Sequence, residues 1–350
     1  MNGHDGRERP PAGDRPLDVA AIGYGYWGPK LLRNLAAIPG CRIAGICDTA
    51  PQQLAAAAGV HPGVALTSTP ADLLRNPAVD AVLISTPVAT HYELALEALG
   101  AGKHVFVEKP LAASTEEARR LVAEAAQRGL VLMVGHVFLY AGAVRKAREL
   151  IVSERFGPIR YYDSARLNSV LFRQDVGALW DLAVHDLSIL DYLVDERPRA
   201  VSATGISHRD DGLESTAYLT VFYESDLLAH INVNWLAPEK VRRTLIGGAG
   251  QMILYDDVEP IEKIRVFDQG ISYNGAGPGL GAMEVAPAWA PELDGTEALR
   301  RELEDFVDAI VTGRAPRADG ASGLRVVHLL EAATRSLRDR GRPVELRADG

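Results

Sequence analysis

Residues Leu17–Gly28 read L-D-V-A-A-I-G-Y-G-Y-W-G and decide the fold of the chain. A short apolar run is followed by three glycines at the spacing G-x-G-x-x-G, which are Gly23, Gly25 and Gly28. An apolar run of this length bounded by glycine is typical of a strand buried on both faces of a parallel sheet. The spacing predicts a tight turn at Gly23, close approach of a phosphate at Gly25, and close packing of the next helix at Gly28.

An acidic residue follows the next apolar run. Residues 42–47 read R-I-A-G-I-C and lead to Asp48, 20 residues after Gly28. In a dinucleotide-binding unit, an acid at about this distance bonds the adenine ribose. An ordinary glycine loop and a solvated aspartate are the alternatives, but strand, loop, helix, strand and acid in this order favour the nucleotide site. Asp48 would repel a 2′-phosphate, and residues 49–53 contain no Arg or Lys. NAD is therefore favoured over NADP.

Length and composition set the broad class. A chain of 350 residues with 47% hydrophobic and 24% charged residues is long enough for two domains with a large core. The net charge of −9 argues against a nucleic-acid partner, and we find no apolar run of the ~18 residues that a membrane span needs. The two cysteines, Cys41 and Cys47, suggest no disulfide framework and fit the cytoplasm. Residues 1–16 are expected to be a disordered leader.

Strands alternate with helices over residues 17–138. Further strands are expected at about 64–66, 80–85, 103–107 and 131–134, with helices at about 27–37, 51–58, 90–100 and 114–128, the last opened by a capping box of Ser114 and Glu117. This rhythm predicts a Rossmann domain with a doubly wound parallel sheet. Ligands bind at the carboxyl ends of such strands, where the sequence places Gly23, Asp48, residues 85–87, Lys109 and His136.

The pattern changes in residues 139–350. Alternating runs at 159–167, 199–207, 215–223, 227–235, 242–246, 252–255 and 264–267 predict an α+β domain with a large open, mostly antiparallel sheet. Helices are expected at about 143–153, 183–193, 296–312 and 323–340, and a loop at 269–295. We expect the late helices to pack back on the first domain. The open sheet face, with its apolar residues, suggests a homodimer or homotetramer.

Two stretches carry residues suited to proton transfer and charge stabilisation. Asp181 and His185 in W-D-L-A-V-H-D are spaced i, i+4 and would share a helix face, where the carboxylate can orient the imidazole. The alternatives are an N-capping Asp181 with a satisfied histidine, or a metal pair, for which no further ligands stand at diagnostic spacing. Lys109 follows a strand at the ligand edge and could stabilise negative charge on a substrate oxygen; an ordinary surface lysine is the alternative.

The motifs G-Y-G-Y-W-G (23–28), S-T-P-x-x-x-H (85–91), E-K-P (108–110) and W-D-L-A-V-H-D (180–186) resemble the glucose–fructose oxidoreductase/inositol dehydrogenase (Gfo/Idh/MocA) family. The resemblance extends from Leu17 to about Leu346. It implies an NAD(P)-dependent dehydrogenase in which Lys109 and His185 are catalytic, with Asp181 in the same active site. Val88 stands where many members have Asn.

Within that family the chain is most similar to nucleotide-sugar 3-dehydrogenases of the UDP-N-acetylglucosaminuronate type. The similarity lies in residues 25–34, 135–140, 166–168, 180–190 and 234–242. Lys30 in place of a common Asn and Val184 in place of a common Pro leave the substrate open. The cations Arg166, Arg173, Lys240, Arg242 and Arg243 would suit an anionic substrate, because arginine binds phosphates and carboxylates, although any one of them could be a solvated surface charge.

These observations define a set of predicted site residues without a metal site. The predicted cofactor-binding residues are Gly23, Gly25, Tyr26, Trp27, Gly28, Asp48, Ser85, Thr86, Pro87, His91, Glu108 and Lys109. The predicted substrate-binding residues are Lys109, His136, Tyr140, Arg166, Asn168, Asp181, His185, Trp235 and Lys240.

The predicted reaction moves a hydride between nicotinamide and a sugar hydroxyl or keto carbon, in particular carbon 3 of a nucleotide-linked sugar. A keto-sugar reductase, a cyclitol dehydrogenase and a non-catalytic dinucleotide sensor are the alternatives.

Overall fold

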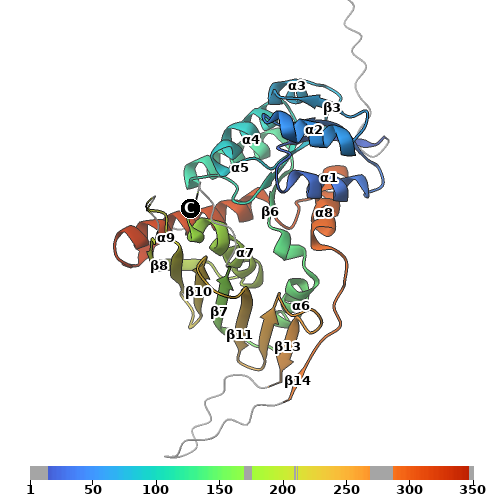
Figure 1. Cartoon of the computed structure of the whole chain (residues 1–350). Helices are drawn as coiled ribbons and strands as arrows, with labels where there is room; N and C mark the ends of the chain where they lie inside the picture. Colours follow the sequence, from blue (N-terminus) through green and yellow to red (C-terminus); the bar gives the residue numbers. More distant parts are fainter. Residues whose placement is uncertain (1–14, 169–175, 209, 211, 269–286, 347–350) are drawn as a thin grey trace, which may run out of the picture. The chain divides into compact units, whose positions relative to one another are not determined.

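The computed structural model describes residues 15–168, 176–208, 210, 212–268 and 287–346. Most of the predicted leader, and residues 269–286 of the predicted loop, lie outside these ranges. Contacts divide the chain into two compact units. The first comprises residues up to Leu111 together with Arg119–Gly135 and Leu299–Gly320, and the second comprises Ala112–Ala118, His136–Ala298 and residues from Ala321 on. Each unit is built around one sheet (Figure 1).

The first unit contains a six-stranded parallel sheet in the order β3-β2-β1-β4-β5-β6. Its strands are β1 (Leu17–Ile22), β2 (Cys41–Cys47), β3 (Ala65–Thr67), β4 (Ala81–Ile84), β5 (His104–Glu108) and β6 (Leu132–Gly135). Every residue of β1 and β4 is buried, as expected of strands covered on both faces. The chain reverses its direction of strand addition between β1 and β4, which confirms the doubly wound Rossmann sheet.

Helices connect these strands. They are α1 (Gly28–Ala36), α2 (Pro51–Val60), α3 (Pro70–Leu74), α4 (His91–Gly100) after the 3-10 turn η1 (Val88–Thr90), α5 (Thr115–Arg128) and α8 (Ala298–Thr312). Ser114 caps α5 by accepting the Glu117 backbone N–H at 3.3 Å, while Glu117 accepts the Ala113 N–H at 3.1 Å. The late helix α8 belongs to this unit: Phe306 meets Phe106 of β5 edge-on, with ring centroids 5.8 Å apart.

The second unit contains a nine-stranded sheet in the order β14-β13-β12-β11-β7-β10-β9-β8-β15. Its strands are β7 (Ile159–Leu167), β8 (Pro198–Ile206), β9 (Thr216–Tyr223), β10 (Leu228–Asn234), β11 (Val241–Gly248), β12 (Met252–Asp256), β13 (Ile264–Phe267), β14 (Ala288–Trp289) and β15 (Val344–Glu345). All neighbouring pairs are antiparallel except β7 with β10, which confirms the mostly antiparallel sheet.

Two short strands and one helical turn differ from the sequence prediction. The strand β14 falls within the predicted loop, and β15 follows the last helix; two-residue strands carry too little alternation to be recognised. The helix that begins near Ala183 is preceded by a π-helical turn, η3 (Leu179–Ala183), which places Asp181 inside the helical segment. The other helical elements of this unit are η2 (Val137–Tyr140), α6 (Gly142–Ile151), α7 (Val184–Leu193) and α9 (Gly320–Arg338).

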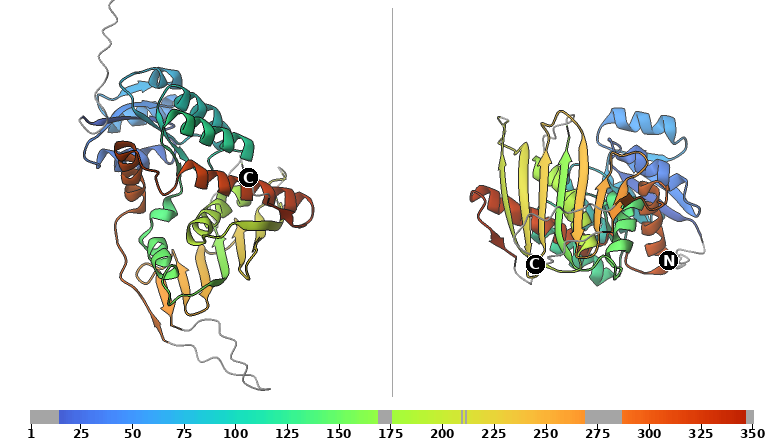
Figure 2. Two further views of the ribbon diagram at one scale, coloured as in Figure 1. Left: turned by 180° about the vertical axis from the view of Figure 1, so that it is seen from behind. Right: turned by 90° about the horizontal axis from the view of Figure 1, so that it is seen from below.

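The helices of the second unit gather on one face of its sheet (Figure 2). Burial alternates accordingly: in β9, Ala217, Leu219 and Val221 are buried, while Tyr218 between them is exposed. The core of the unit therefore lies between this face and α6, α7 and α9. No helix in the described ranges is long and apolar enough to cross a membrane.

Candidate active site

The glycine loop after β1 is shaped by two close backbone contacts. Gly23 has φ +97°, and its N–H donates to the Cys47 carbonyl at 2.8 Å. A Cβ on Gly28 would lie 2.4 Å from the Gly23 carbonyl oxygen, so only glycine lets α1 start this close to β1. A Cβ on Gly25 would meet nothing within 4 Å. The turn and the close helix packing are as predicted, and the phosphate contact at Gly25 stays a prediction.

Asp48 closes this loop from the end of β2. Its two carboxylate oxygens accept the backbone N–H groups of Tyr24, at 2.7 Å, and Ala50, at 2.8 Å. The half-buried carboxylate is therefore held beside the glycine loop in one orientation. A negative charge fixed at this position suits the hydroxyl groups of a ribose, which can donate hydrogen bonds to it.

A cavity of about 480 Å³ opens at this edge of the first unit. Its lining comes from the ends of β1, β2 and β4 and from the first turns of α3 and α4, and consists of Ile22, Gly23, Gly25, Cys47, Asp48, Thr49, Pro70, Ser85, Thr86, Pro87, Thr90, Glu93, Leu94 and Glu97. None of these lining residues is Lys or Arg. Burial raises the pKa of the Cys47 thiol to about 11, so it lines the cavity as a neutral group. The glycine loop, the fixed acid and this cavity together fit a dinucleotide.

The S-T-P-x-x-x-H motif lies beside the loop. The Ser85 hydroxyl donates to the Gly23 carbonyl at 2.9 Å and ties β4 to the turn. His91 is 1% exposed, and its ring nitrogens lie 2.9 Å from the carbonyl oxygens of Thr86 and Pro110. A neutral imidazole has only one N–H, so both contacts are hydrogen bonds only when the ring carries two protons. His91 thus joins the turn after β4 to the turn after β5.

Glu108 and Lys109 end β5 and are both 8% exposed. The Lys109–Pro110 peptide bond is cis. The Glu108 carboxylate accepts the Lys109 backbone N–H at 3.3 Å. Lys109 is therefore a mostly buried lysine at the carboxyl edge of the sheet, not a solvated surface residue.

Tyr26 and Trp27 form a small aromatic group at the start of α1. Their rings meet edge-on with centroids 5.4 Å apart, and the Lys30 ammonium lies 3.2 Å from the centroid of Tyr26 and 4.7 Å from that of Trp27. Tyr26 is 71% exposed. Cation–π attraction holds Lys30 over these rings, so the residue that departs from the family pattern has a local partner.

In the second unit, Asp181 and His185 lie on either side of the junction between η3 and α7. The Trp235 indole N–H donates to the Asp181 carboxylate at 3.3 Å, and the His185 ring meets the Phe138 ring edge-on at 5.0 Å. Both Asp181 and His185 are half-buried, so each is supported by the fold while part of it is open to solvent. π-Helical turns occur often at functional sites. The N-cap alternative for Asp181 is wrong, because Asp181 lies inside η3, whose N-cap is Ala178, and its backbone N–H donates to the Gly177 carbonyl at 3.0 Å.

A buried ion pair lies under the Phe138 ring. Arg166, 3% exposed, donates to Asp186 through Nε at 2.6 Å and Nη2 at 3.3 Å, and its guanidinium lies 4.6 Å from the Phe138 centroid. Burial opposes the charge, but Asp186 outweighs it and raises the pKa of Arg166. This pairing favours a supporting role for Arg166, and its predicted substrate contact stays a prediction. Arg242 lies 5.5 Å from the same ring and donates to Asp257 at 3.1 Å.

The remaining predicted substrate residues differ in exposure. His136, Tyr140 and Trp235 are at most 2% exposed. Trp235 donates its indole N–H to Asp181. Asn168 is half-buried and donates its backbone N–H to Asn234 at 2.8 Å. Lys240 is exposed, just before β11. Arg173 lies outside the described residues.

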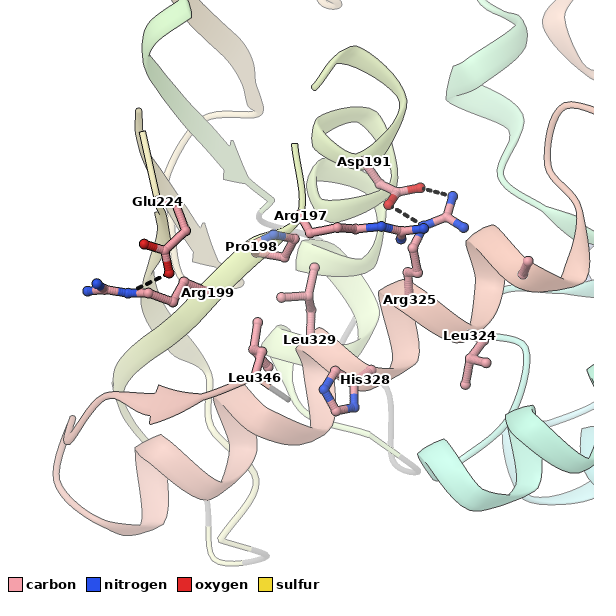
Figure 3. A pocket seen from close by; sticks show the side chains of 11 residues that line it. Asp191, Arg197, Pro198, Arg199, Glu224, Leu324, Arg325, His328, Leu329 and Leu346 are labelled. Atoms are coloured by element: carbon pink, nitrogen blue, oxygen red, sulfur yellow. Dashed lines mark hydrogen bonds and ion pairs between the residues drawn. The ribbon is translucent and has the colours of Figure 1, made fainter. Parts of the chain in front are cut away.

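A second cavity, of about 450 Å³, lies in the second unit beside α9 (Figure 3). Asp191 accepts two hydrogen bonds from Arg325 at 2.6 and 2.7 Å, and Arg199 lies 3.9 Å from Glu224. Most charges in this cavity are thus paired with one another, and no residue of the predicted site lines it.

Comparison with known proteins places the chain in a family. The model of an oxidoreductase family with an NAD-binding Rossmann fold matches residues 17–136, and that of the GFO/IDH/MocA C-terminal domain matches residues 144–253. The chain belongs to this family of NAD(P)-dependent sugar oxidoreductases.

Individual relatives span nearly the whole chain. UDP-N-acetylglucosamine 3-dehydrogenase from Acidithiobacillus ferrooxidans is 31% identical over 313 residues, which cover 89% of this chain and 94% of the relative. Its structure matches with a TM-score of 0.80, covering 92% and 98% of the two chains at 27% identity. GenD2 from gentamicin A biosynthesis, solved in complex with NAD, matches with a TM-score of 0.82 at 27% identity, covering 95% and 97%. Inositol 2-dehydrogenase 2 from Saccharopolyspora erythraea is 27% identical, covering 92% and 93%.

Several residues with a clear place in these sites escaped the sequence analysis. Phe138 contacts the His185 ring and lies 4.6 Å from the Arg166 guanidinium. It falls within residues 135–140, a stretch that resembles the family, but it carries no ionisable group to mark it. Glu93 and Glu97 line the first cavity from α4. Their signal was available, because the helix that follows a strand end in such a sheet begins beside the ligand site.

Proposed function

We propose that the chain is an NAD-dependent dehydrogenase that oxidises a hydroxyl group at carbon 3 of a nucleotide-linked sugar, or reduces the corresponding keto sugar. The observation that carries the proposal is the half-buried His185 with the anchored Asp181 carboxylate one helical turn before it. A histidine supported in this way can exchange a proton near neutral pH. The similarity to a UDP-N-acetylglucosamine 3-dehydrogenase over most of both chains supports the substrate class.

In this proposal His185 takes the proton of the sugar hydroxyl, and Asp181 favours the charged imidazolium that results. Lys109 stabilises the negative charge that develops on the substrate oxygen. NAD, when bound, supplies the acceptor for the hydride that leaves the sugar carbon. The glycine loop and Asp48 hold the cofactor; Asp48 and a cavity lining without Lys or Arg favour NAD over NADP.

Variants of the two proposed catalytic residues test the assignment. Lys109→Ala and His185→Ala should each lower turnover by ~10²-fold or more, while calorimetry still detects NAD binding. His208→Asn is the matched control, because His208 bonds Ser215 and has no role in the proposal. Turnover near the wild-type value in both alanine variants would contradict the assignment.

A cyclitol dehydrogenase is the second candidate, favoured by the similarity to an inositol 2-dehydrogenase. A variant of Lys240 distinguishes the nucleotide-sugar dehydrogenase from the cyclitol dehydrogenase. An exposed cation suits the phosphate of a nucleotide sugar, whereas an uncharged cyclitol has no anionic group to pair with it. Lys240→Gln should raise KM for a UDP-sugar by ~10-fold if it forms one charged contact, and leave KM for inositol unchanged. Lys146→Gln on α6, where Lys146 pairs with Glu149, is the matched control.

The open face of the nine-stranded sheet suits self-association, as proposed from the sequence. Tyr218, Leu228 and Leu245 are exposed by 43%, 45% and 41%, respectively, and lie next to buried residues in β9, β10 and β11, so they point away from the buried face of the sheet. Exposed apolar side chains of this kind mark interaction surfaces when they lie together. Light scattering should give a dimer or tetramer mass, and the double variant Tyr218→Lys/Leu245→Lys should lower it; a monomeric wild-type protein would contradict this.

A further inference from the structure

Glu302 on α8 is a buried acid to which the proposed reaction gives no role. It is 0% exposed, and both of its carboxyl oxygens are without a hydrogen-bond partner in the ranges that the structure describes. An ionised carboxylate in such a place is strongly unfavourable, since neither water nor a donor stabilises the charge. A group in this position takes up a proton instead.

Helix α8 packs against β5, with Glu302 near Glu108. On β5, Phe106 and Glu108 are two residues apart and share one face of the sheet. On α8, Glu302 and Phe306 are four residues apart and share one face of the helix. Phe306 packs against Phe106 with ring centroids 5.8 Å apart, and Glu302 lies close enough to Glu108 to feel its negative charge.

The space for the Glu108 carboxyl comes from Gly135, its neighbour on β6. A Cβ on Gly135 would lie 3.2 Å from the carboxyl carbon of Glu108. A side chain at this position would push the Glu108 carboxyl aside. The absence of a side chain at Gly135 therefore leaves room for the mostly buried Glu108 carboxyl beside β6.

The charges around Glu302 oppose its ionisation. Burial raises its pKa well above the ordinary 4.5, and the negative charges of Glu108 on β5 and Asp305 on α8 raise it further. Asp305 is partly neutralised by Arg314 at 2.5 Å, and β6 carries no ionisable residue from Leu132 to Gly135. Glu108 is thus the nearby acid that competes most directly for the same proton.

We propose that Glu302 is a neutral carboxylic acid in the folded protein and that the pair Glu302–Glu108 carries a single negative charge, on Glu108. Two ionised carboxylates that lie near each other and away from solvent repel strongly, so the fully buried Glu302 keeps the proton. Glu108 then stays ionised and accepts the Lys109 backbone N–H more strongly than a neutral acid would. Glu302 is therefore a positioning residue: through Glu108 it helps to hold the turn that carries Lys109. The catalytic importance of that turn rests on the function proposed above.

Infrared spectroscopy tests the protonation state without any turnover. The difference spectrum of wild type minus Glu302→Gln at pH 7 should contain the C=O stretching band of a protonated carboxyl group. The matched control is Glu304→Gln, since Glu304 on the same helix is 41% exposed and bonds Arg300. Its difference spectrum should contain only carboxylate bands. Absence of the protonated band in the Glu302→Gln difference would overturn the proposal.

Stability against pH gives a second readout. A carboxyl whose pKa is raised on folding contributes stability that is fully present below its unfolded pKa and is lost as pH rises through the folded pKa. In Glu302→Gln the amide resembles the neutral acid and does not ionise, so the variant does not lose this stability as pH rises. The Tm of Glu302→Gln should therefore exceed that of wild type by an amount that grows from pH 5 to pH 8, whereas Glu304→Gln should run parallel to wild type. Parallel curves for Glu302→Gln would also overturn the proposal.

The positioning role is tested by turnover across the same pH range. At alkaline pH, where Glu302 of the wild type ionises, turnover should decline, and Glu302→Gln should decline less. Identical pH profiles would refute the positioning role. A wild type that turns over none of the sugars offered would instead count against the proposed function, and the infrared and Tm results would still decide whether Glu302 is neutral.

Discussion

Replacing Asp186 with Ala should destabilise the second unit far more than the loss of an ordinary ion pair. In the pair with Arg166 the two side chains are 4% and 2% exposed, and the carboxylate accepts bonds at 2.6 and 3.3 Å. Asp186→Ala leaves the guanidinium of Arg166, which stays protonated in proteins, buried without its counter-ion. Breaking such a pair from one side costs about 3–5 kcal/mol. For a unit of about 150–250 residues this corresponds to a fall in Tm of ~6–20 °C.

Two further variants make this prediction specific. In the double variant Arg166→Met/Asp186→Leu no buried charge is left, and most of the lost stability should return. Glu224→Ala removes a surface pair that is 3.9 Å long and more than half exposed on both sides, and should cost at most about 1 kcal/mol. Calorimetric unfolding measures all three. The reasoning is refuted if Asp186→Ala costs no more than Glu224→Ala, or if the double variant is as unstable as the single one.

Three other predictions concern the first unit. Gly28→Ala should lower the free energy of unfolding by about 1–3 kcal/mol and bind NAD ~10-fold more weakly, because its Cβ would lie 2.4 Å from the Gly23 carbonyl oxygen. In the control Gly100→Ala the Cβ would meet nothing within 4 Å, so both stability and NAD affinity should be unchanged. Calorimetry measures both quantities. Asp48→Asn should weaken NAD binding and shift the ratio of the NAD and NADP dissociation constants in favour of NADP. An unchanged ratio would contradict a role for Asp48 in the choice of cofactor. His91→Ala should lower the free energy of unfolding by about 1–3 kcal/mol, because the carbonyls of Thr86 and Pro110 both lose the ring that lies 2.9 Å from them. Urea unfolding measures this change.

Local patterns predicted the first unit well because each strand there is short, apolar and bounded by turn residues. Gly23 and Gly28 have the backbone roles that their spacing indicated, and β2 ends at Cys47, directly before Asp48, as expected. The parallel sheet follows from the alternation of such segments with helices. The short strands β14 and β15 were missed, since two residues pair only through contacts distant in sequence.

The environment of individual site residues was the part that could not be predicted. Arg166 was expected to bind an anionic substrate, with a solvated surface charge as the alternative; the structure buries it against Asp186, 20 residues later in the chain, and its substrate contact stays a prediction. Trp235 was expected in a sugar site, and its bond to Asp181 was not foreseen; its sugar contact stays a prediction. Such pairings arise from tertiary packing, and a residue type alone does not show whether its charge or its N–H is already satisfied inside the fold.

Transfer of a labelled hydrogen tests the central claim most directly. A UDP-N-acetylglucosamine that carries deuterium at carbon 3 would be incubated with NAD and the wild-type protein, and the reduced cofactor analysed by mass spectrometry, with His185→Ala as the control. The proposed function predicts that the reduced nicotinamide carries the deuterium in the wild-type reaction and that its formation is ~10²-fold slower in the variant. Deuterium that stays on the sugar, or reduced nicotinamide without the label, would contradict oxidation at carbon 3.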